Sequence, residues 1–444
     1  MTSPRTCPAI LVAAPASGQG KTTIVSALAR LHARQGRRVR VFKCGPDFLD
    51  PFWHQLASGH PVYQMDLWMT GEADVQARLH AAAQDSDLII VEGVMGLFDG
   101  DPSAADLAQR FGLPVLAVID ASAMAGTFGA LAFGLQHYRP GLPWAGVLAN
   151  RVASERHGGM LAQGVAAEHW LGALLRNPAL TLPERHLGLT VATELDDAMT
   201  RLDAAADALA QAPLGQMDTQ ALARWNVAFP PPGEALAVSS LLLGRRVAVA
   251  RDAAFCFLYQ ANLDTLRQLG AEVVFFSALA GDPLPACDAL WLPGGYPELH
   301  AQALGANCQL RDSLRAHVDQ GRPVWAECGG MMALFDDIEM ANGDVHPMWG
   351  LLPGRVTMQQ RLAALGPQQL TLPTGVLRGH TFHYSTANST AHVVTRTARP
   401  GAQILQASGE AVYARGSVRA SYFHPWFASC PAAAASLFLP GEFT

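Results

Sequence analysis

A glycine-rich loop near the start of the chain joins an apolar run to a helix-like segment. The run covers residues 9–14, the loop residues 15–23 and the helical pattern residues 22–35. Such a loop lets backbone N–H groups approach a polyphosphate, and the amino end of the following helix adds a favourable dipole. The strict motif has glycine where this chain has Pro15, but the ending Gly-x-Gly-Lys-Thr-Thr is intact. The loop therefore predicts an α/β fold with a nucleotide site.

The polar residues of this loop suit the binding of ATP. We expect Lys21 to reach the β- and γ-phosphates and the Thr22 hydroxyl to bind Mg²⁺. Asn150 and Arg151 end a later strand, where an amide can hydrogen-bond a nucleobase. The predicted nucleotide-binding residues are Ser17, Gly18, Gly20, Lys21, Thr22, Thr23, Asn150 and Arg151.

Three acids follow predicted strands and are expected near the loop. Glu92 ends the strand at 88–92 and can hold Mg²⁺ or its water shell. Asp47 and Asp50 come just after the strand at 39–43, where they can bind metal or steer a phosphoryl group. The alternatives are an ordinary strand-end acid for Glu92 and turn-forming aspartates for the other two.

Strand-like and helix-like segments alternate along the first half of the chain. This rhythm predicts a doubly wound parallel sheet, with functional groups at the carboxyl ends of its strands. The predicted strands are 9–14, 39–43, 88–92, 114–120 and 144–150, and the predicted helices are 22–35, 73–83, 103–111 and 126–138.

A proline-rich stretch divides the chain into two predicted domains. Residues 230–232 are three successive prolines, which can neither continue a helix nor pair inside a sheet. We predict an ATP-binding domain at 1–210, a linker at 211–244 and a second α/β domain at 245–444. The strands expected in the second domain are 246–250, 273–277, 289–293, 323–326, 379–385 and 417–423.

Composition excludes several classes of protein. Of the 444 residues 50% are hydrophobic, which is ample for two cores, and the net charge of −6 gives no basic excess for a nucleic acid. No apolar run approaches the roughly 18 residues of a membrane span. The seven cysteines are odd in number and form no C-x-x-C pair, which argues against a disulfide framework or a zinc knuckle. We expect a soluble, cytoplasmic protein that binds neither nucleic acid nor membrane.

One cysteine stands in a catalytic context. Residues 323–332 read as strand, sharp turn and helix, with Cys328 at the turn, as in a nucleophile elbow. The amino end of a helix favours the reactive thiolate. The N–H of Gly329 and the amides of Gly294 and Gly295 are the predicted oxyanion donors. The alternative is a buried cysteine in a glycine turn.

A thiol nucleophile needs a base, and His424 is the predicted one. It lies 96 residues after Cys328, at the end of the strand at 417–423. An imidazole at a strand end can face a site and accept the thiol proton. His380 and His383 are the alternatives.

Together, these motifs resemble the CobB/CbiA family of cobyrinate or hydrogenobyrinate a,c-diamide synthases of vitamin B12 biosynthesis. The resemblance covers nearly the whole chain, and the linked set is far more specific than any one motif. The segments are APASGQGKTT at 14–23, KCGPDFLDP at 43–51, VEGVMGLFDG at 91–100, ANRV at 149–152, PGGYPELH at 293–300, AECGG at 326–330 and GHTFHYS at 379–385.

The resemblance implies an N-terminal domain like dethiobiotin synthetase and a C-terminal glutamine amidotransferase domain of the triad type (class I). It implies that ATP phosphorylates a substrate carboxylate, with Mg²⁺ bound by Thr22, Asp47 and Glu92. Cys328 would hydrolyse glutamine with His424 as base, and the ammonia would attack the acyl phosphate. The implied substrate is a corrinoid polycarboxylate, amidated at its a and c acetates. The two domains would have to dock around a closed path for ammonia.

Two positions depart from the family pattern. Triad amidotransferases carry His-Pro-Glu, in which the glutamate orients the histidine, but here Trp426 follows His424 and Pro425. An indole cannot accept the imidazole proton. The site is therefore a Cys–His dyad, or another acid or carbonyl orients His424. The second departure is Pro293, where relatives often have another glycine.

Other functions stay open at this point. Within the enzyme class, the alternatives are cobyric acid synthase and sirohydrochlorin a,c-diamide synthase. Outside it, the alternative is a phosphate-loop nucleotide switch with an inactive amidotransferase domain. Such switches have a lysine where this chain has Ala16, and they leave Cys328 unexplained. Cobalt in the substrate, the order of amidation and a homodimer also stay open.

Overall fold

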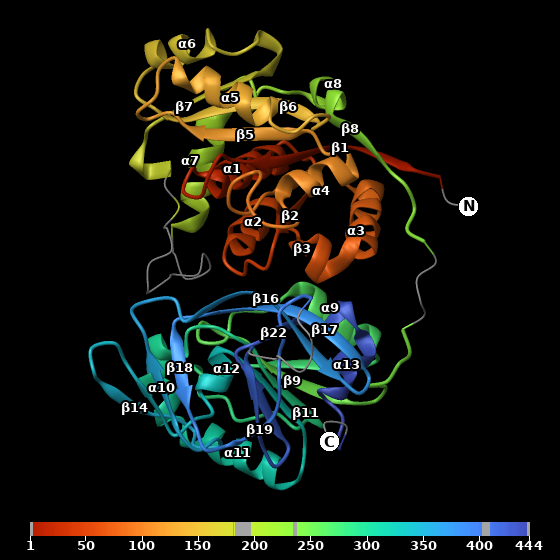
Figure 1. Cartoon of the computed structure of the whole chain (residues 1–444), viewed down its shortest axis with the longest axis vertical. Coiled ribbons are helices and arrows are strands. Elements are labelled where there is room, and N and C mark those ends of the chain that lie inside the picture. Colours follow the sequence, from red (N-terminus) through yellow and green to blue (C-terminus); the bar gives the residue numbers. More distant parts are fainter. Residues whose placement is uncertain (1–2, 181, 183–196, 234–237, 402–408, 442–444) are drawn as a thin grey trace. The chain divides into compact units, whose positions relative to one another are not determined.

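The computed structural model describes residues 3–180, 182, 197–233, 238–401 and 409–441 (Figure 1). The chain divides into two compact units, Met1–Ala235 and Leu236–Thr444. Each unit has its own sheet and its own apolar cores. Among the described residues, no helix is both long enough and apolar enough to cross a membrane.

The first unit is built on a parallel sheet. Its strands are β1 (Arg5–Ala13), β2 (Val39–Cys44), β3 (Tyr63–Met65), β4 (Leu88–Glu92), β5 (Val115–Asp120), β6 (Trp144–Val152), β7 (Trp170–Leu175) and β8 (Asn226–Phe229). Seven of these described strands follow the order β3-β2-β4-β1-β5-β6-β7, and each neighbouring pair is parallel. The carboxyl ends of β1, β2, β4 and β6 therefore meet at one edge, where the predicted nucleotide residues lie.

Side chains of β1 alternate between two cores, one on each face of the sheet. Leu11 and Ala13 belong to one core, and Ile10 and Val12 belong to the other. All four are at most 1% exposed. A strand covered on both faces needs an apolar residue at every position, which explains why this segment is a continuous hydrophobic run.

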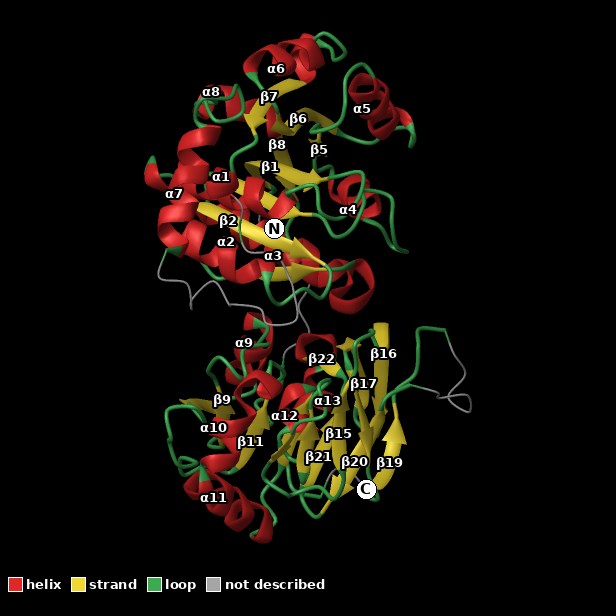
Figure 2. Ribbon diagram, turned by 90° about the vertical axis from the view of Figure 1, so that its left-hand side faces the viewer, coloured by secondary structure: helices red, strands yellow, loops and turns green. Residues whose placement is uncertain are grey.

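Helices cover both faces of this sheet, as Figure 2 shows. One core contains residues of α1 (Lys21–Arg34), α2 (Asp50–Ser58), α7 (Ala198–Leu209) and α8 (Thr219–Leu222). The other contains residues of α3 (Glu72–Asp85), α4 (Ala104–Phe111), α5 (Thr127–His137) and α6 (Glu155–Ala162). The predicted doubly wound parallel sheet is confirmed.

The first unit extends further along the chain than predicted. The interval 211–244 was expected to be a linker, but it contains α8 and β8. β8 pairs antiparallel with β1, from Phe229 beside Arg5 to Asn226 beside Pro8. The sequence pattern missed β8 because it has four residues and its burial alternates. The three prolines follow it at once, consistent with their inability to extend a ladder; residues 234–237 lie outside the described part.

The second unit is also built on a mainly parallel sheet. Its order is β10-β9-β11-β12-β21-β20-β19; the first five are parallel, and β20 and β19 are antiparallel. The strands of this sheet are β9 (Arg246–Ala250), β10 (Glu272–Phe276), β11 (Ala289–Leu292), β12 (Val324–Glu327), β19 (His392–Arg396), β20 (Ala411–Arg415) and β21 (Val418–Ser421).

Helices again lie on both faces of the second sheet. One core contains residues of α9 (Gln260–Gln268) and α13 (Pro431–Ser436). The other contains residues of α10 (Ala301–Ala306), α11 (Cys308–Asp319) and α12 (Gly329–Met332). The prediction of two α/β units is thus confirmed.

Two smaller sheets in the second unit were largely missed by the sequence pattern. One has the order β14-β13-β15-β18 and the other β16-β17-β22. The strands of these two sheets are β13 (Asp337–Glu339), β14 (Val345–Pro347), β15 (Arg355–Met358), β16 (Ala364–Leu372), β17 (Gly375–His383), β18 (Ser385–Asn388) and β22 (His424–Trp426). The predicted strand at 379–385 is divided between β17 and β18.

Candidate active sites

The phosphate loop of the first unit depends on glycine at two positions. Gly18 and Gly20 have φ of 77° and 90°, in the left-handed region that favours glycine. A Cβ on Gly20 would also lie 2.3 Å from Nδ2 of Asn150. The loop therefore approaches the carboxyl end of β6 as closely as the backbone allows.

The loop lysine is held at the edge of a cavity. Nζ of Lys21 donates to the carbonyl oxygens of Met95, at 2.7 Å, and Ala16, at 3.4 Å. The side chain is 8% exposed, and burial lowers its pKa. Two carbonyls thus fix the ammonium group beside the loop that would carry the phosphates.

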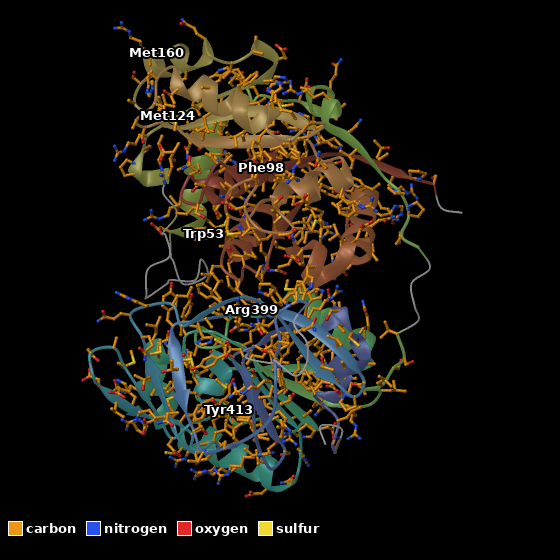
Figure 3. All side chains as sticks on the ribbon, viewed as in Figure 1. Trp53, Phe98, Met124, Met160, Arg399 and Tyr413 are labelled. Carbon is orange, nitrogen blue, oxygen red and sulfur yellow. The ribbon has the colours of Figure 1, made fainter. Side chains whose placement is uncertain are left out.

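The cavity has a volume of about 400 Å³. Trp53 of α2, labelled in Figure 3, forms part of its wall. Every residue predicted to bind the nucleotide or the metal, or to act in phosphoryl transfer, lines it: Ser17, Gly18, Gly20, Lys21, Thr22, Thr23, Asp47, Asp50, Glu92, Asn150 and Arg151. The structure therefore brings the whole predicted set to one place.

A buried charge network lies at the floor of this site. Oγ1 of Thr22 donates to Oε1 of Glu92 at 2.8 Å. Nζ of Lys43 lies 2.6 Å from Oδ2 of Asp50, 3.2 Å from Oε1 of Glu92 and 3.7 Å from Oδ2 of Asp47. Although burial alone would lower the pKa of Lys43, the three acids raise it above its usual value. The ammonium group therefore stays charged and gathers all three predicted acids.

A histidine completes the network. Nε2 of His54 contacts Oε2 of Glu92, and its Nδ1 lies 2.9 Å from Oγ of Ser26. His54 is wholly buried on α2. Each oxygen of Glu92 thus has a partner, and the net effect of these partners is to lower the pKa of this carboxyl despite the opposing effect of its burial.

The donors present suit Mg²⁺. Thr22, Asp47 and Glu92 offer the hard oxygen ligands that this ion prefers. No group of three or more His, Cys, Asp or Glu side chains that could hold a metal was found among the described residues. Mg²⁺ at phosphate sites takes few protein ligands and fills its coordination with phosphate and water, so the donor set fits the ion when ATP is present.

Asn150 and Arg151 contact the loop backbone. Nδ2 of Asn150 donates to the carbonyl of Gln19 at 2.9 Å, and Nη1 of Arg151 donates to the carbonyl of Gly18 at 2.9 Å. Arg151 also pairs with Asp120 at 2.7 Å. In the structure the Asn150 amide braces the phosphate loop, and its expected contact with a nucleobase stays a prediction.

The second unit presents Cys328 on a strained turn. The residue follows β12 and precedes α12, with φ 43° and ψ −106°. A non-glycine residue with positive φ is strained, and such strain concentrates at functional sites. Its N–H donates to the carbonyl of Ser421 at 2.8 Å. The predicted strand–turn–helix order is present.

The thiol of Cys328 is not a resting thiolate. Burial raises its pKa above the usual range, and the carboxyls of Glu298, Glu410 and Glu327 raise it further. Only the backbone N–H of Gly329 lowers it. We expected the helix dipole to favour the thiolate, but α12 has four residues and cannot offset burial. The thiol therefore needs a base at the moment of reaction.

His424 has the properties of such a base. It begins β22 and is 1% exposed. Burial and the nearby His383 lower its pKa to about 3, so the imidazole is neutral at physiological pH. Its ring stacks on that of His380 with centroids 5.0 Å apart. A neutral imidazole can accept a proton, which a charged one cannot.

The two alternative histidines are engaged elsewhere. Nδ1 of His383 donates to the carbonyl of Ser385 at 2.7 Å, and its Nε2 lies 3.1 Å from Oε1 of Glu410. Nδ1 of His380 lies 3.2 Å from the Tyr259 hydroxyl. These contacts favour His424 over both.

The predicted oxyanion glycines crowd together beside this pair. A Cβ on Gly294 would lie 2.4 Å from Cε1 of His424. A Cβ on Gly329 would lie 2.8 Å from the backbone nitrogen of Gly295. Only glycine fits at these positions, so the two loops approach each other through bare backbone.

Both units match known domain families. Residues 10–189 match the CobQ/CobB/MinD/ParA nucleotide binding domain, and residues 246–432 match the CobB/CobQ-like glutamine amidotransferase domain. A protein of Stutzerimonas stutzeri named hydrogenobyrinate a,c-diamide synthase is 56% identical over 441 residues, 99% of this chain and 100% of that protein. The chain belongs to this synthase family.

Other synthases of the family support the assignment. A hydrogenobyrinate a,c-diamide synthase of Pseudomonas aeruginosa is 54% identical, over 100% of this chain and 99% of that protein. A cobyrinate a,c-diamide synthase of Herminiimonas arsenicoxydans is 48% identical, over 97% and 96%. Among solved structures, a glutamine amidotransferase aligns over 43% of this chain and 96% of its own chain, at 20% identity. Its TM-score of 0.31 is too low to add to the argument.

Three residues of this synthase-family chain were given no role by the sequence pattern. Lys43 and His54 join the charge network, and Glu327 lies beside both Cys328 and His424. A signal existed for the first, since Lys21 and Lys43 are the only two lysines in the chain. The other two are revealed only by tertiary contacts.

Proposed function

We propose that the protein catalyses the ATP- and glutamine-dependent amidation of the a and c acetates of hydrogenobyrinate or cobyrinate, in the cytoplasm. The observation that carries this proposal is a phosphate-loop cavity and a cysteine elbow in one chain that is 56% identical to a synthase of that name. The relatives from Stutzerimonas stutzeri and Pseudomonas aeruginosa are named for hydrogenobyrinate, which makes the cobalt-free acid the favoured substrate.

The first unit would activate the carboxylate. A carboxylate is a poor acyl donor, and its phosphorylation by ATP supplies a leaving group. The backbone of the loop and the ammonium of Lys21 would hold the phosphates, with the hydroxyl of Thr22 and the carboxylates of Asp47 and Glu92 holding Mg²⁺. The bound ion would neutralise charge that develops on the phosphates. Asp50 would remain on Lys43 and help to orient the reacting groups.

The second unit would supply ammonia. His424 would take the proton from Sγ of Cys328, and the thiolate would attack the side-chain amide carbon of glutamine. The amides of Gly294, Gly295 and Gly329 would stabilise the oxyanion. As the C–N bond breaks, the imidazolium would return its proton to the leaving ammonia, and water would hydrolyse the thioester to glutamate. The ammonia would then displace phosphate from the acyl phosphate.

The test is to offer the purified protein hydrogenobyrinic and cobyrinic acids separately, with ATP, Mg²⁺ and glutamine, and to measure product masses. Each amidation replaces a hydroxyl by an amino group, so a diamide is distinguishable from a monoamide. Omitting ATP is the control. The proposal fails if neither acid gives a diamide, and a product from cobyrinic acid alone would reverse the substrate preference.

A further inference from the structure

The departure at Trp426 leaves open what orients His424, and the structure offers a candidate next to the nucleophile. Oε2 of Glu327 lies 3.4 Å from Nδ1 of His424. Their side chains are 2% and 1% exposed. Glu327 ends β12, immediately before Cys328, so the same turn that presents the thiol also fixes this carboxyl.

The other oxygen of Glu327 is fixed by two indoles. Nε1 of Trp291 donates to Oε1 at 2.9 Å, and Nε1 of Trp325 donates to the same oxygen at 2.8 Å. Both indoles are donors only, so Oε1 must act as an acceptor. Both tryptophans are fully buried. Only Oε2 is left to face the imidazole, and the carboxyl cannot turn without breaking two hydrogen bonds.

We propose that Glu327 is the positioning residue for His424, in place of the acid that Trp426 excludes. The carboxylate accepts the Nδ1 proton of His424, which leaves Nε2 bare to receive the proton of Cys328. The positive charge that then develops on the ring lies beside the carboxylate. The inference deepens the proposed glutaminase role of Cys328 and His424, and rests on it.

The pKa directions set the condition for this pair. Burial raises the pKa of Glu327 well above its usual value, which favours the protonated acid, whereas the hydrogen bonds from Trp325 and Trp291 lower it and so favour the carboxylate. A protonated Glu327 would donate to Nδ1 and leave the imidazole proton on Nε2, so the proposed orientation requires the carboxylate. When His424 takes the proton of Cys328, its positive charge lies beside that carboxylate, and two paired charges cost less in a dry site than one charge alone. The 3.4 Å contact is longer than most hydrogen bonds, as is common in catalytic sites before substrate binds.

Glu410 is the competing acid, and its contacts point elsewhere. Its Oε1 accepts a hydrogen bond from Oγ1 of Thr381 at 2.8 Å and lies 3.1 Å from Nε2 of His383. Its direct contacts are therefore with a different histidine, and it acts on His424 only through its charge, which raises the pKa of that imidazole. Replacing it gives a matched control, since both acids lie close enough to raise the pKa of Cys328.

The decisive variant is Glu327→Gln. The two indoles can donate only to the amide oxygen, so they hold that oxygen at the Oε1 position and turn the NH₂ group toward Nδ1 of His424. An amide that donates to Nδ1 forces the proton onto Nε2, and the base is blocked. We expect kcat with glutamine to fall about 100-fold or more, as for loss of a general base. The KM for glutamine should change little. The rate of synthesis with ammonium salts should also change little.

The comparison with Glu410→Gln separates the two acids. We expect that variant to keep at least a third of wild-type kcat with glutamine. Equal kcat for Glu327→Gln and wild type, or a greater loss in Glu410→Gln, would overturn the inference. If Cys328→Ala kept its glutamine-dependent activity, the glutaminase role itself would fail instead, so the two failures are distinguishable.

A measurement on the wild-type protein covers the case in which Glu327→Gln does not fold. With ¹⁵N-labelled histidine, the ring nitrogens of His424 report its tautomer, and a His424→Gln sample assigns the signal. Protonated Nδ1 and bare Nε2 are expected at neutral pH. A proton on Nε2 alone would contradict the proposed orientation.

Discussion

Nζ of Lys43 lies 3.2 Å from Oε1 of Glu92, and the two side chains are 3% and 1% exposed. The residues are register partners on adjacent parallel strands, β2 and β4. Their pairing places a charged pair under the phosphate loop, where Thr22 also meets Glu92. The metal-binding carboxylate of the proposed mechanism is therefore positioned by a lysine that touches all three acids.

Removal of this lysine should destabilise the first unit. Lys43→Met leaves buried carboxylates without their counter-charge, and we expect a loss of about 3–5 kcal/mol in the free energy of unfolding. Urea unfolding measures it. Adding Glu92→Gln should recover part of the loss. Arg40 lies on the same strand as Lys43, and Arg40→Met breaks a partly exposed pair with Asp85 of α3, so it should cost at most about 1 kcal/mol. Equal losses in the two single variants would contradict the network.

Lys21→Ala should stop amidation with glutamine and with ammonium salts alike. The ammonium group is the only side-chain charge assigned to the β- and γ-phosphates, and its loss removes electrostatic stabilisation that nitrogen supply cannot replace. ADP release in the presence of substrate measures the step. Arg34 lies at the far end of the same helix, and the Arg34→Ala variant should release ADP at the wild-type rate. Unchanged ATP turnover in Lys21→Ala would exclude the phosphate-loop role.

Cys328→Ala should separate the two half-reactions. We expect glutamine-dependent synthesis to disappear and ammonium-dependent synthesis to continue, because only the former needs the thiol nucleophile. Amide product formed with each nitrogen source is the readout. Cys308→Ala alters an exposed cysteine on α11 and should leave both activities intact. Loss of both activities in Cys328→Ala would argue against the assignment.

Acid should weaken the first unit through His32. Burial and the nearby Arg37 lower the pKa of His32 to about 4 from an ordinary 6.5. Between these two values the unfolded chain binds a proton that the folded chain does not, so stability falls as pH falls, by about 1.4 kcal/mol per unit. His32→Gln should flatten this slope in urea titrations between pH 6.5 and 4.5. His137→Gln, at an exposed position, is the control; an equal slope in wild type and His32→Gln would refute the prediction.

Much of the architecture follows from local sequence. The strand at 88–92 matches β4 at both ends, and that at 246–250 matches β9, because a strand buried on both faces must be apolar throughout. β16 was missed even though it pairs with β17 across a short turn at residues 373–374. β8 was missed because its pairing partner, β1, lies far away in the sequence. The linker was placed too early for the same reason.

The sequence by itself determined which chemistry the chain can carry. Gly20 and Lys21 predict a phosphate site and Cys328 a nucleophile, because each function needs a particular backbone turn that few residues permit. The tertiary structure decided what surrounds them. It placed Lys43 among three acids, turned Asn150 onto the loop backbone, and made Cys328 dependent on a base by burying it. Charge states depend on burial and on partners distant along the chain, and only the folded chain brings these together.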